Sequence, residues 1–397
     1  MNVMKRIILF LSAFLLLCSC VRDNITVLND DPREWYLPVC TDTILCTDVA
    51  EAITGISIGM NTRIVRATFM YHSMFDTTQV SLSGCVCWPL GSRYNEEIWL
   101  ENHFTATRWD QCPSQSYMPG MIMCHTRQAV YVGSDYMGLG LTRNMPAPYF
   151  NSPLLARQSI DCFKAALQVL KDNGISLASD FSTYNFGYSL GGSVSLGVAK
   201  LVEQDPELKK AVHLKKSFCG GGPYDQMVMI ESYVNNPKHV AEMPVVMALD
   251  IETLKNSNLV SNISNLFTDR FNSSDILEMV ESRLYDTAIL NSAIRNRCGA
   301  RISDCLNPEL LDTSGTQYRN FRNLHKAFDL TEGWEPTIPL LFFHSKADGV
   351  VSYDCMESFR NRHKGNPVVT YLDANGSHND TGELFYEKII GEVWMED

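Results

Sequence analysis

The sequence predicts an α/β fold with a mostly parallel central sheet, an antiparallel start and helices on both faces. Two strand-like segments, 64–75 and 80–88, flank the polar residues Asp76-Thr77-Thr78-Gln79, which is typical of a hairpin. After Asn173-Gly174, strand-like and helical segments alternate, which favours parallel pairing with helices packed on the sheet. Between 223 and 334 the alternation stops and the pattern becomes helical.

The individual elements follow from hydrophobic periodicity. In the second hairpin segment Val80, Leu82, Val86 and Trp88 fall on one face at period two, as a half-buried strand requires. The helix predicted to end near Leu170 is followed by Asn173-Gly174, a common C-terminal stop. Further strands are expected at 98–103, 129–133, 184–187, 216–220, 338–344 and 368–372, and helices at 154–170, 190–202 and 353–363.

The segment from Pro223 to Trp334 is predicted to be a helical insertion rather than an independent domain. Asp275 and Glu278 form a plausible capping pair, and the apolar residues from Ile276 to Leu284 lie on one helical face. We therefore expect a signal peptide over 1–20, a tether over 21–48, the first part of the core over 49–222, the insertion over 223–334, and the second part of the core over 335–397.

The N-terminus is typical of an exported protein. Lys5 and Arg6 precede an apolar run, Ile7 to Leu17, that is short for a membrane-spanning helix and suits a signal peptide. Leu17-Cys18-Ser19-Cys20 resembles a bacterial lipobox, with Cys20 as the acylated first residue of the mature chain. We expect a bacterial lipoprotein of the outer membrane or cell surface, on its periplasmic or external face. The alternative is an ordinary secretory signal with Cys20 incidental.

Charge and composition exclude some partners. The net charge is −12 over 397 residues, which argues against binding a phosphate backbone, so no nucleic-acid partner is expected. A hydrophobic content of 45% is enough for a sizeable core. Neither the net charge nor the hydrophobic content argues for or against an uncharged ester as a substrate. The sequence does not determine the oligomeric state.

The thirteen cysteines suit an oxidising compartment. If Cys18 leaves with the signal and Cys20 is acylated, eleven remain, so at least one is unpaired. Most are interpreted as small buried hydrophobes, with some bridges whose connectivity the sequence does not fix. No cysteine spacing with histidine suits zinc, and no metal or cofactor is expected. Near neighbours suggest the pairs Cys40/Cys46, Cys112/Cys124 and Cys298/Cys305.

A nucleophile is predicted where a strand meets a helix. Gly187-Tyr188-Ser189-Leu190-Gly191 lies between the strand 184–187 and the helix 190–202. A serine on such a sharp turn projects its oxygen above the sheet, and the flanking glycines keep side chains out of the crowded contact. The N–H of Leu190 is then a candidate donor to a developing oxyanion. The alternative is that Ser189 merely begins a helix.

A base and an orienting acid are predicted later in the chain. His378 lies in a loop after the last strand, and Asp348 lies just past the strand 338–344. The order Ser…Asp…His, each beyond the carboxyl end of its own strand, favours a catalytic triad. Asp373 is a competing acid, but it is only five residues before His378 and would have to fold back sharply, so Asp348 is preferred. Alternatively, Asp348 caps a turn and His378 is a plain loop histidine.

From Ile64 to Glu392 the chain resembles the α/β-hydrolases, and within them the secreted bacterial lipase and esterase group. The resemblance depends on Ser189 in its glycine-flanked turn, Asp348 after His344-Ser345-Lys346-Ala347, His378 after Asn375-Gly376-Ser377, and Gly133-Ser134-Asp135-Tyr136-Met137-Gly138. It implies ester hydrolysis through an acyl-enzyme, with a lipid or other hydrophobic acyl ester as the small-molecule substrate. It also implies that the helical insertion lies over the site as a lid.

One feature departs from this group. Its members usually carry His-Gly at the end of the third strand, where a backbone N–H completes the oxyanion hole. Here Asn102-His103-Phe104-Thr105 stands at that place, with Phe104 instead of glycine. The second oxyanion donor is therefore expected to be the N–H of Phe104 or of Thr105.

Two other functions remain open at this point. The same triad suits a glycan deacetylase or an exopeptidase that cuts near proline, because the substrate is chosen by the pocket and not by the fold. A different class of function is a surface lipoprotein that binds a ligand on a degenerate hydrolase scaffold. A complete triad disfavours the binder.

Overall fold

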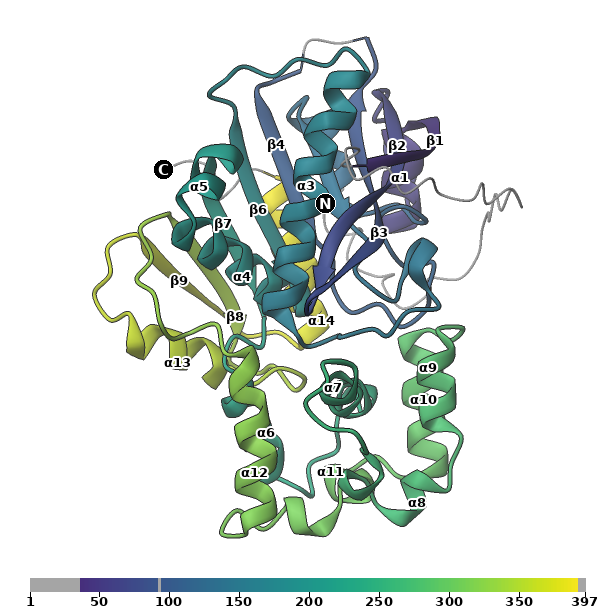
Figure 1. The fold of residues 1–397 in the computed structure, drawn as a ribbon, viewed down its shortest axis with the longest axis vertical. Helices are drawn as coiled ribbons and strands as arrows, with labels where there is room; N and C mark the ends of the chain where they lie inside the picture. The colour runs from purple at the N-terminus through teal and green to yellow at the C-terminus, as the bar shows by residue number, and fades with distance from the viewer. Residues whose placement is uncertain (1–35, 92–93, 392–397) are drawn as a thin grey trace, which may run out of the picture.

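The structure is a computed structural model, which describes residues 36–91 and 94–391. The predicted signal peptide with Cys20, and the first part of the predicted tether, lie outside the described residues. The centre is a sheet of nine strands in the order β1-β2-β3-β5-β4-β6-β7-β8-β9 (Figure 1). The strands are β1 Tyr36–Leu45, β2 Arg63–Phe75, β3 Thr78–Pro89, β4 Glu97–Asn102, β5 Val130–Ser134, β6 Ser182–Tyr188, β7 Leu214–Gly220, β8 Leu340–Ser345 and β9 Val369–Ala374.

The predicted fold class is confirmed. Strands β1, β2, β3 and β5 pair antiparallel, and from β5 through β4 to β9 every pairing is parallel. The β2–β3 hairpin pairs Phe75 with Thr78, so the turn consists of Asp76 and Thr77, and Asp76 adopts the left-handed conformation (φ 51°). The parallel strands bring their carboxyl ends to one edge of the sheet, where ligands bind in open α/β sheets.

The predicted tether is too long. Its last part forms the edge strand β1 and the start of helix α1, Cys46–Thr54, which packs on the sheet. Among residues 36–391 that the structure describes, strand β1 pairs with β2 alone. Most of its side chains are exposed, so the alternation that reveals a strand in sequence is weak there. Its pairing with β2 is supported by two hydrogen bonds from the Arg66 guanidinium to Asp42, of 3.1 and 2.8 Å.

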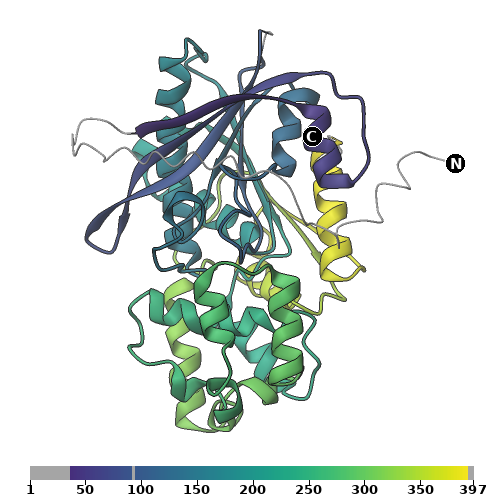
Figure 2. The same ribbon diagram turned by 90° about the vertical axis from the view of Figure 1, so that its right-hand side faces the viewer.

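Helices cover both faces of the sheet (Figures 1 and 2). Strand β8 illustrates this arrangement. Phe342 packs on the face of the sheet that carries α3, α4 and α13, whereas Phe343 packs with Phe385 of α14 on the opposite face. Alternate residues of a strand point to opposite faces, so a doubly covered strand is apolar throughout. The helices of this part are α2 Met123–Thr126, α3 Ser152–Asp172, α4 Leu190–Gln204, α5 Pro206–Val212, α13 Asp354–Arg362 and α14 His378–Ile390.

The helical insertion forms a bundle that lies beyond one end of the strands of the sheet (Figures 1 and 2). Its hydrophobic residues join the same buried cluster as α3 and α4, so core and insertion share one interior. Over the described ranges no helix combines the length and apolar character needed to cross a bilayer. The insertion contains α6 Gln226–Asn235, α7 Val245–Asn256, α8 Asp269–Asn272, α9 Ile276–Ser282, α10 Thr287–Arg297, α11 Ile302–Cys305 and α12 Thr316–Leu324.

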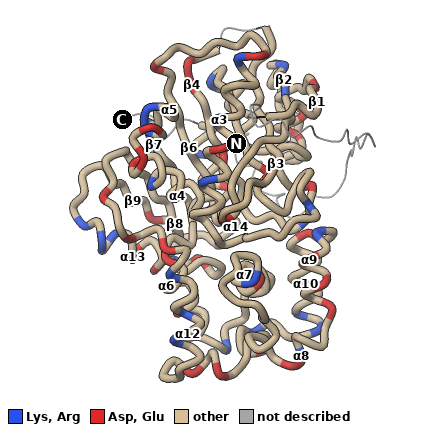
Figure 3. The backbone as a smooth tube through the Cα atoms, in the orientation of Figure 1, with Lys and Arg blue, Asp and Glu red and all other residues tan. Residues whose placement is uncertain are grey.

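Positions of basic and acidic residues are interspersed along the backbone of the core and of the insertion (Figure 3). The eleven cysteines between residues 36 and 391 are all free, so the suggested bridges are absent there. Sequence neighbours need not be spatial neighbours: Cys40 is exposed on β1, whereas Cys46 is buried at the start of α1. Except for Cys40 these thiols are buried, which agrees with their interpretation as small core residues.

One carboxyl group lies in the interior of the sheet. Glu101 of β4 is 1% exposed, and its Oε2 accepts the N–H of Gly120 at 3.0 Å. Burial raises the pKa of Glu101 to about 7, although the Gly120 N–H and the hydroxyls of Tyr131 and Tyr386 oppose the shift. A buried carboxyl without a cationic partner is more stable protonated than charged.

This carboxyl predicts a pH-dependent stability. The folded chain binds the Glu101 proton more tightly than the unfolded chain, so the free energy of unfolding falls by about 3 kcal/mol as pH rises from 4.5 to 7. Glu101→Gln is neutral and should remove this part of the pH dependence. Urea unfolding at pH 5 and pH 8 measures it, with Glu387→Gln on the exposed surface of α14 as the control. Equal pH dependence in wild type and Glu101→Gln contradicts the prediction.

Candidate active site

Ser189 stands on the sharp turn that joins β6 to α4. Its backbone has φ 58° and ψ −124°, a conformation that a residue with a Cβ rarely adopts. Such strain persists only where the surroundings fix it, and it is typical of functional sites. The turn is held by the Ser189 N–H, which donates to the Gly220 carbonyl of β7 at 2.9 Å. The side chain is 8% exposed and leaves the sheet at its carboxyl edge.

The two flanking glycines are required by backbone contacts. A Cβ on Gly191 would collide with the carbonyl oxygen of Asn102, and a Cβ on Gly187 would collide with those of Asn102 and Gly191. The first turn of α4 therefore packs directly on the end of β4. This close approach is the physical reason for the glycine spacing that the sequence shows.

A buried network of polar side chains lies behind this turn. The Asn102 amide donates to Asn185 Oδ1 at 2.6 Å and to Ser195 Oγ at 2.9 Å, and its Oδ1 accepts from Ser159 at 2.7 Å. Asn185 in turn donates to Ser217 at 2.9 Å. The network joins β4, β6, β7, α3 and α4. Because its members satisfy one another, it fixes the strand ends that carry the site.

His378 is the first residue of α14, after the N-cap residue Ser377, whose side chain accepts the N–H of Asp380. Its Nε2 lies 2.9 Å from Ser189 Oγ. The hydroxyl of Tyr188 donates to the His378 carbonyl at 2.8 Å, so the residue before the serine holds the backbone of the histidine. The imidazole is buried, and the cap and the tyrosine together fix its direction.

Asp348 lies in the loop after β8, with a side chain that is fully buried. Its Oδ2 is 2.7 Å from His378 Nδ1, and its Oδ1 accepts the N–H groups of Val350 at 2.9 Å and Val351 at 2.8 Å. Burial alone would raise the pKa of Asp348, but hydrogen bonds and charge from His344 and His378 outweigh it and hold that pKa well below its usual range. The carboxylate is therefore charged across the physiological pH range.

The competing acid, Asp373, lies elsewhere. It is the fifth residue of β9, and its carboxylate binds Lys346 Nζ at 2.6 Å and the Tyr353 hydroxyl at 2.7 Å. Its side chain is 35% exposed and also faces Arg360 at 3.3 Å. The structure thus brings Ser189, His378 and Asp348 into one hydrogen-bonded chain and leaves Asp373 in a surface ion-pair network.

The three candidate oxyanion donors are backbone N–H groups in different surroundings. Leu190 opens α4, so its N–H belongs to the first turn, which has no intrahelical acceptor. Phe104 is 39% exposed, and its ring meets Tyr386 edge-on. The hydroxyl of Thr105 contacts that of Tyr149.

His103 faces the Asp135 carbonyl at 3.2 Å, and its ring stacks on that of Tyr136. These contacts link the loop after β4 to the loop after β5.

The insertion is attached to the loops at the carboxyl edge of the sheet. Thr107, after β4, donates to the Tyr285 carbonyl at 2.9 Å, and the N–H of Phe150, before α3, donates to Thr253 at 3.0 Å. Tyr233 donates to the carbonyl of Val350 at 2.6 Å, two residues after Asp348. Insertion and triad loops are therefore mechanically joined.

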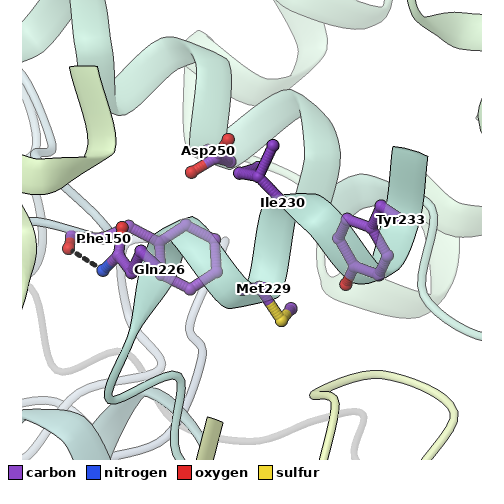
Figure 4. A pocket seen from close by; sticks show the side chains of 6 residues that line it. All are labelled: Phe150, Gln226, Met229, Ile230, Tyr233 and Asp250. Carbon is purple, nitrogen blue, oxygen red and sulfur yellow. Dashed lines mark hydrogen bonds between the residues drawn. The ribbon is translucent and has the colours of Figure 1, made fainter. Parts of the chain in front are cut away.

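A small, mostly apolar pocket lies within this junction (Figure 4). Helix α6 supplies Met229 and Ile230, and Gln226 donates to the Phe150 carbonyl at 2.5 Å. Asp250 of α7 also faces the pocket, and its carboxylate binds His325 Nε2 at 2.9 Å. The lining is Phe150, Gln226, Met229, Ile230, Tyr233 and Asp250.

Chemically, the arrangement is a hydroxyl next to a base whose opposite nitrogen faces a buried carboxylate. Such a series of hydrogen bonds activates the hydroxyl as a nucleophile and stabilises the imidazolium formed on proton transfer.

Within the described ranges no cluster of three or more His, Cys, Asp or Glu side chains is arranged to hold a metal ion. The sequence interpretation missed the contact from Tyr188 to His378, for which the sequence carries no signal, because it joins residues 190 positions apart.

Comparison with solved structures identifies the fold. The chain is similar to a rice cell wall degrading esterase, LipA, from Xanthomonas oryzae, with a TM-score of 0.72 and 18% identity over 90% of this chain and 96% of that chain. For a Legionella pneumophila protein that is named only provisionally as a hydrolase, the TM-score is 0.72 and the identity 18%, over 91% of this chain and 96% of that chain. For Candida antarctica lipase A in its closed state, the TM-score is 0.59 and the identity 14%, over 88% of this chain and 81% of that chain.

These likenesses show an α/β-hydrolase fold, as the sequence predicted. No protein-family profile matches the chain, and no curated protein sequence matches it.

Proposed function

We propose that the chain is a serine hydrolase that cleaves carboxylic esters through an acyl-enzyme. The observation that carries the proposal is the continuous hydrogen-bonded chain from Ser189 Oγ through His378 to Asp348, with distances of 2.9 and 2.7 Å. The likeness in fold to proteins named as esterases and lipases supports this choice of substrate class over other acyl compounds.

In the proposed reaction Ser189 Oγ attacks the ester carbonyl while His378 Nε2 accepts its proton. Asp348 accepts the Nδ1–H of the histidine and holds the tautomer that leaves Nε2 facing the serine. The Leu190 N–H, with that of Phe104 or Thr105, binds the oxyanion. The imidazolium then protonates the leaving alcohol, and water attacks the acyl-serine by the same route in reverse.

The experiment that tests the function combines a covalent probe with an ester panel. A fluorophosphonate should label the wild-type chain once, at Ser189, which separates an enzyme from a binding protein. p-Nitrophenyl acetate, butyrate and palmitate should then be hydrolysed. Labelling without turnover of any p-nitrophenyl ester, together with release of acetate from acetylated glycans or cleavage of prolyl peptides, would assign the triad to one of the two alternative substrates.

We propose further that the insertion is a lid over the site, because its residues hydrogen-bond the loops after β4 and β8. Shortening the insertion should therefore change palmitate hydrolysis much more than acetate hydrolysis, because a long acyl chain extends well beyond the reacting ester. The p-nitrophenyl ester panel measures this chain-length preference in the wild-type and the shortened chain. Equal losses on all esters would indicate a structural role.

We also propose that Cys20 anchors the chain to a bacterial outer membrane or cell surface. Acyl chains supply about 0.8 kcal/mol of membrane affinity per buried CH₂, so anchoring depends on them. Cys20→Ser should release the chain from membranes or block its maturation, which fractionation and intact mass measure. Unchanged partitioning and a wild-type mass without lipid exclude the anchor.

A further inference from the structure

A second histidine lies against the carboxylate of the triad. His344 is the fifth residue of β8, and its side chain is 0% exposed. Its Nε2 is 3.3 Å from Asp348 Oδ2, the same oxygen that faces His378. The proposed reaction assigns no role to this ring, although it touches the acid that orients the base.

The partners of the ring determine where its proton lies. Nε2 faces two acceptors, Asp348 Oδ2 and the Val351 carbonyl at 3.1 Å. Nδ1 is buried and has no hydrogen-bond partner in the described chain. A proton on Nδ1 would be buried without an acceptor and would leave Nε2 repelled by two oxygens, so the proton belongs on Nε2.

With this tautomer the Nε2–H of His344 lies between two oxygens. It donates to the Val351 carbonyl at 3.1 Å and lies 3.3 Å from Asp348 Oδ2. Oδ1 of Asp348 accepts two backbone N–H groups, from Val350 and Val351, and Oδ2 faces His378 Nδ1 at 2.7 Å. The N–H of His344 therefore adds an attractive electrostatic contact to the oxygen that orients His378.

We propose that His344 is a positioning residue for the reaction, whose Nε2–H fixes Oδ2 of Asp348 in the place from which it orients His378. The inference rests on the proposed function, because it assigns a role relative to that triad. It predicts that the loss of this one donor changes catalysis through Asp348 and His378, with no effect on how substrate binds.

Two consequences follow for an enzyme without the donor. The carboxylate is less firmly oriented, so the plateau value of kcat falls by about 10- to 100-fold, the range for a hydrogen bond to a charged group, while KM changes little. His378 is then the remaining side-chain donor to Oδ2. The negative charge of the carboxylate is less compensated, so it attracts the His378 ring more strongly. The imidazolium is stabilised, and the acid limb of the kcat/KM profile moves to higher pH.

Other ionisable groups around Asp348 do not account for such a shift. Tyr188, Tyr233 and Cys355 surround it, and burial raises the pKa of each. All three are neutral near pH 7. Tyr353 meets the His344 ring edge-on, and burial raises its pKa to about 12. None of these four groups changes charge near pH 7, so a displaced acid limb does not arise from them.

The test compares His344→Leu with His344→Gln. Leucine keeps much of the volume and removes the donor, whereas glutamine carries an N–H at about the reach of Nε2. We expect lower kcat, nearly unchanged KM and a displaced acid limb for leucine, and recovery of both properties for glutamine. A folded leucine variant with wild-type kcat and acid limb overturns the proposal, and so does a glutamine variant no better than leucine.

A measurement on the wild-type chain keeps the inference testable even if the leucine variant does not fold. The ¹⁵N chemical shifts of the His344 ring distinguish the two tautomers directly, and we expect the Nε2–H form. The Nδ1–H form overturns the proposal without any variant. Failure of the proposed function has a different signature, because the wild-type chain would then neither bind the fluorophosphonate nor hydrolyse an ester.

Discussion

Ser189→Ala should lower kcat for p-nitrophenyl butyrate by about a millionfold, as the loss of a catalytic serine does in another hydrolase. The oxygen that the change removes is the atom 2.9 Å from His378 Nε2. Fluorophosphonate labelling should disappear with it. The fold should persist, because alanine keeps the Cβ and the backbone hydrogen bond to the Gly220 carbonyl.

The matched control is Ser193→Ala, four residues later, in the first turn of α4. Ser193 Oγ is buried and hydrogen-bonds Ser152 Oγ and the Leu190 carbonyl, both at 2.8 Å. This variant loses stability rather than chemistry, so labelling and turnover should survive at temperatures where it is folded. If Ser189→Ala retains most of its activity, or if the probe labels Ser193, the proposed nucleophile is wrong.

Asp348→Asn should lower kcat by about 10⁴-fold, the size found for this change in a serine protease triad. An asparagine that presents its N–H₂ to His378 Nδ1 forces the proton to Nε2, the nitrogen that must accept from the serine. The carboxylate also loses the charge that stabilises the imidazolium. The measurement is kcat in the same ester assay, with unfolding curves to show that each variant is folded.

Asp373→Asn is the paired control, because it changes the same group in the neighbouring strand. Its carboxylate binds Lys346, Tyr353 and Arg360 at the surface, so the change should cost a few-fold at most and lower stability slightly. A larger loss in Asp373→Asn than in Asp348→Asn would transfer the orienting role to Asp373. The nucleophile and the base would remain as proposed.

The fold class was predictable because its signals are local. The hairpin of β2 and β3, the glycine-flanked serine and the alternation of strands and helices are each written within a few residues. The parallel order of the strands then implies that their carboxyl ends share one edge, which places residues from distant parts of the sequence together. That reasoning brings Ser189, Asp348 and His378 near one another without coordinates.

Other features were not predictable because the interactions that create them are long-range. Strand β1 is defined by its pairing with β2, since its own exposed residues lack a clear period. Three pairs of cysteines were suggested as bridges because they are close in sequence, yet pairing depends on their separation in space. The free thiols from Cys46 to Cys355 are buried, which agrees with the interpretation of most cysteines as small core residues.

The sequence by itself determined the type of sheet, the nucleophile turn and the order of the three candidate catalytic residues. These depend on local backbone geometry, which neighbouring residues specify. Only the tertiary structure decided that Tyr188 holds the His378 backbone and that His344 faces the Asp348 carboxylate. The direction of a buried side chain is set by packing among segments far apart in the chain, and hydrogen bonds act only over about 3 Å, so no pattern in the sequence specifies such contacts.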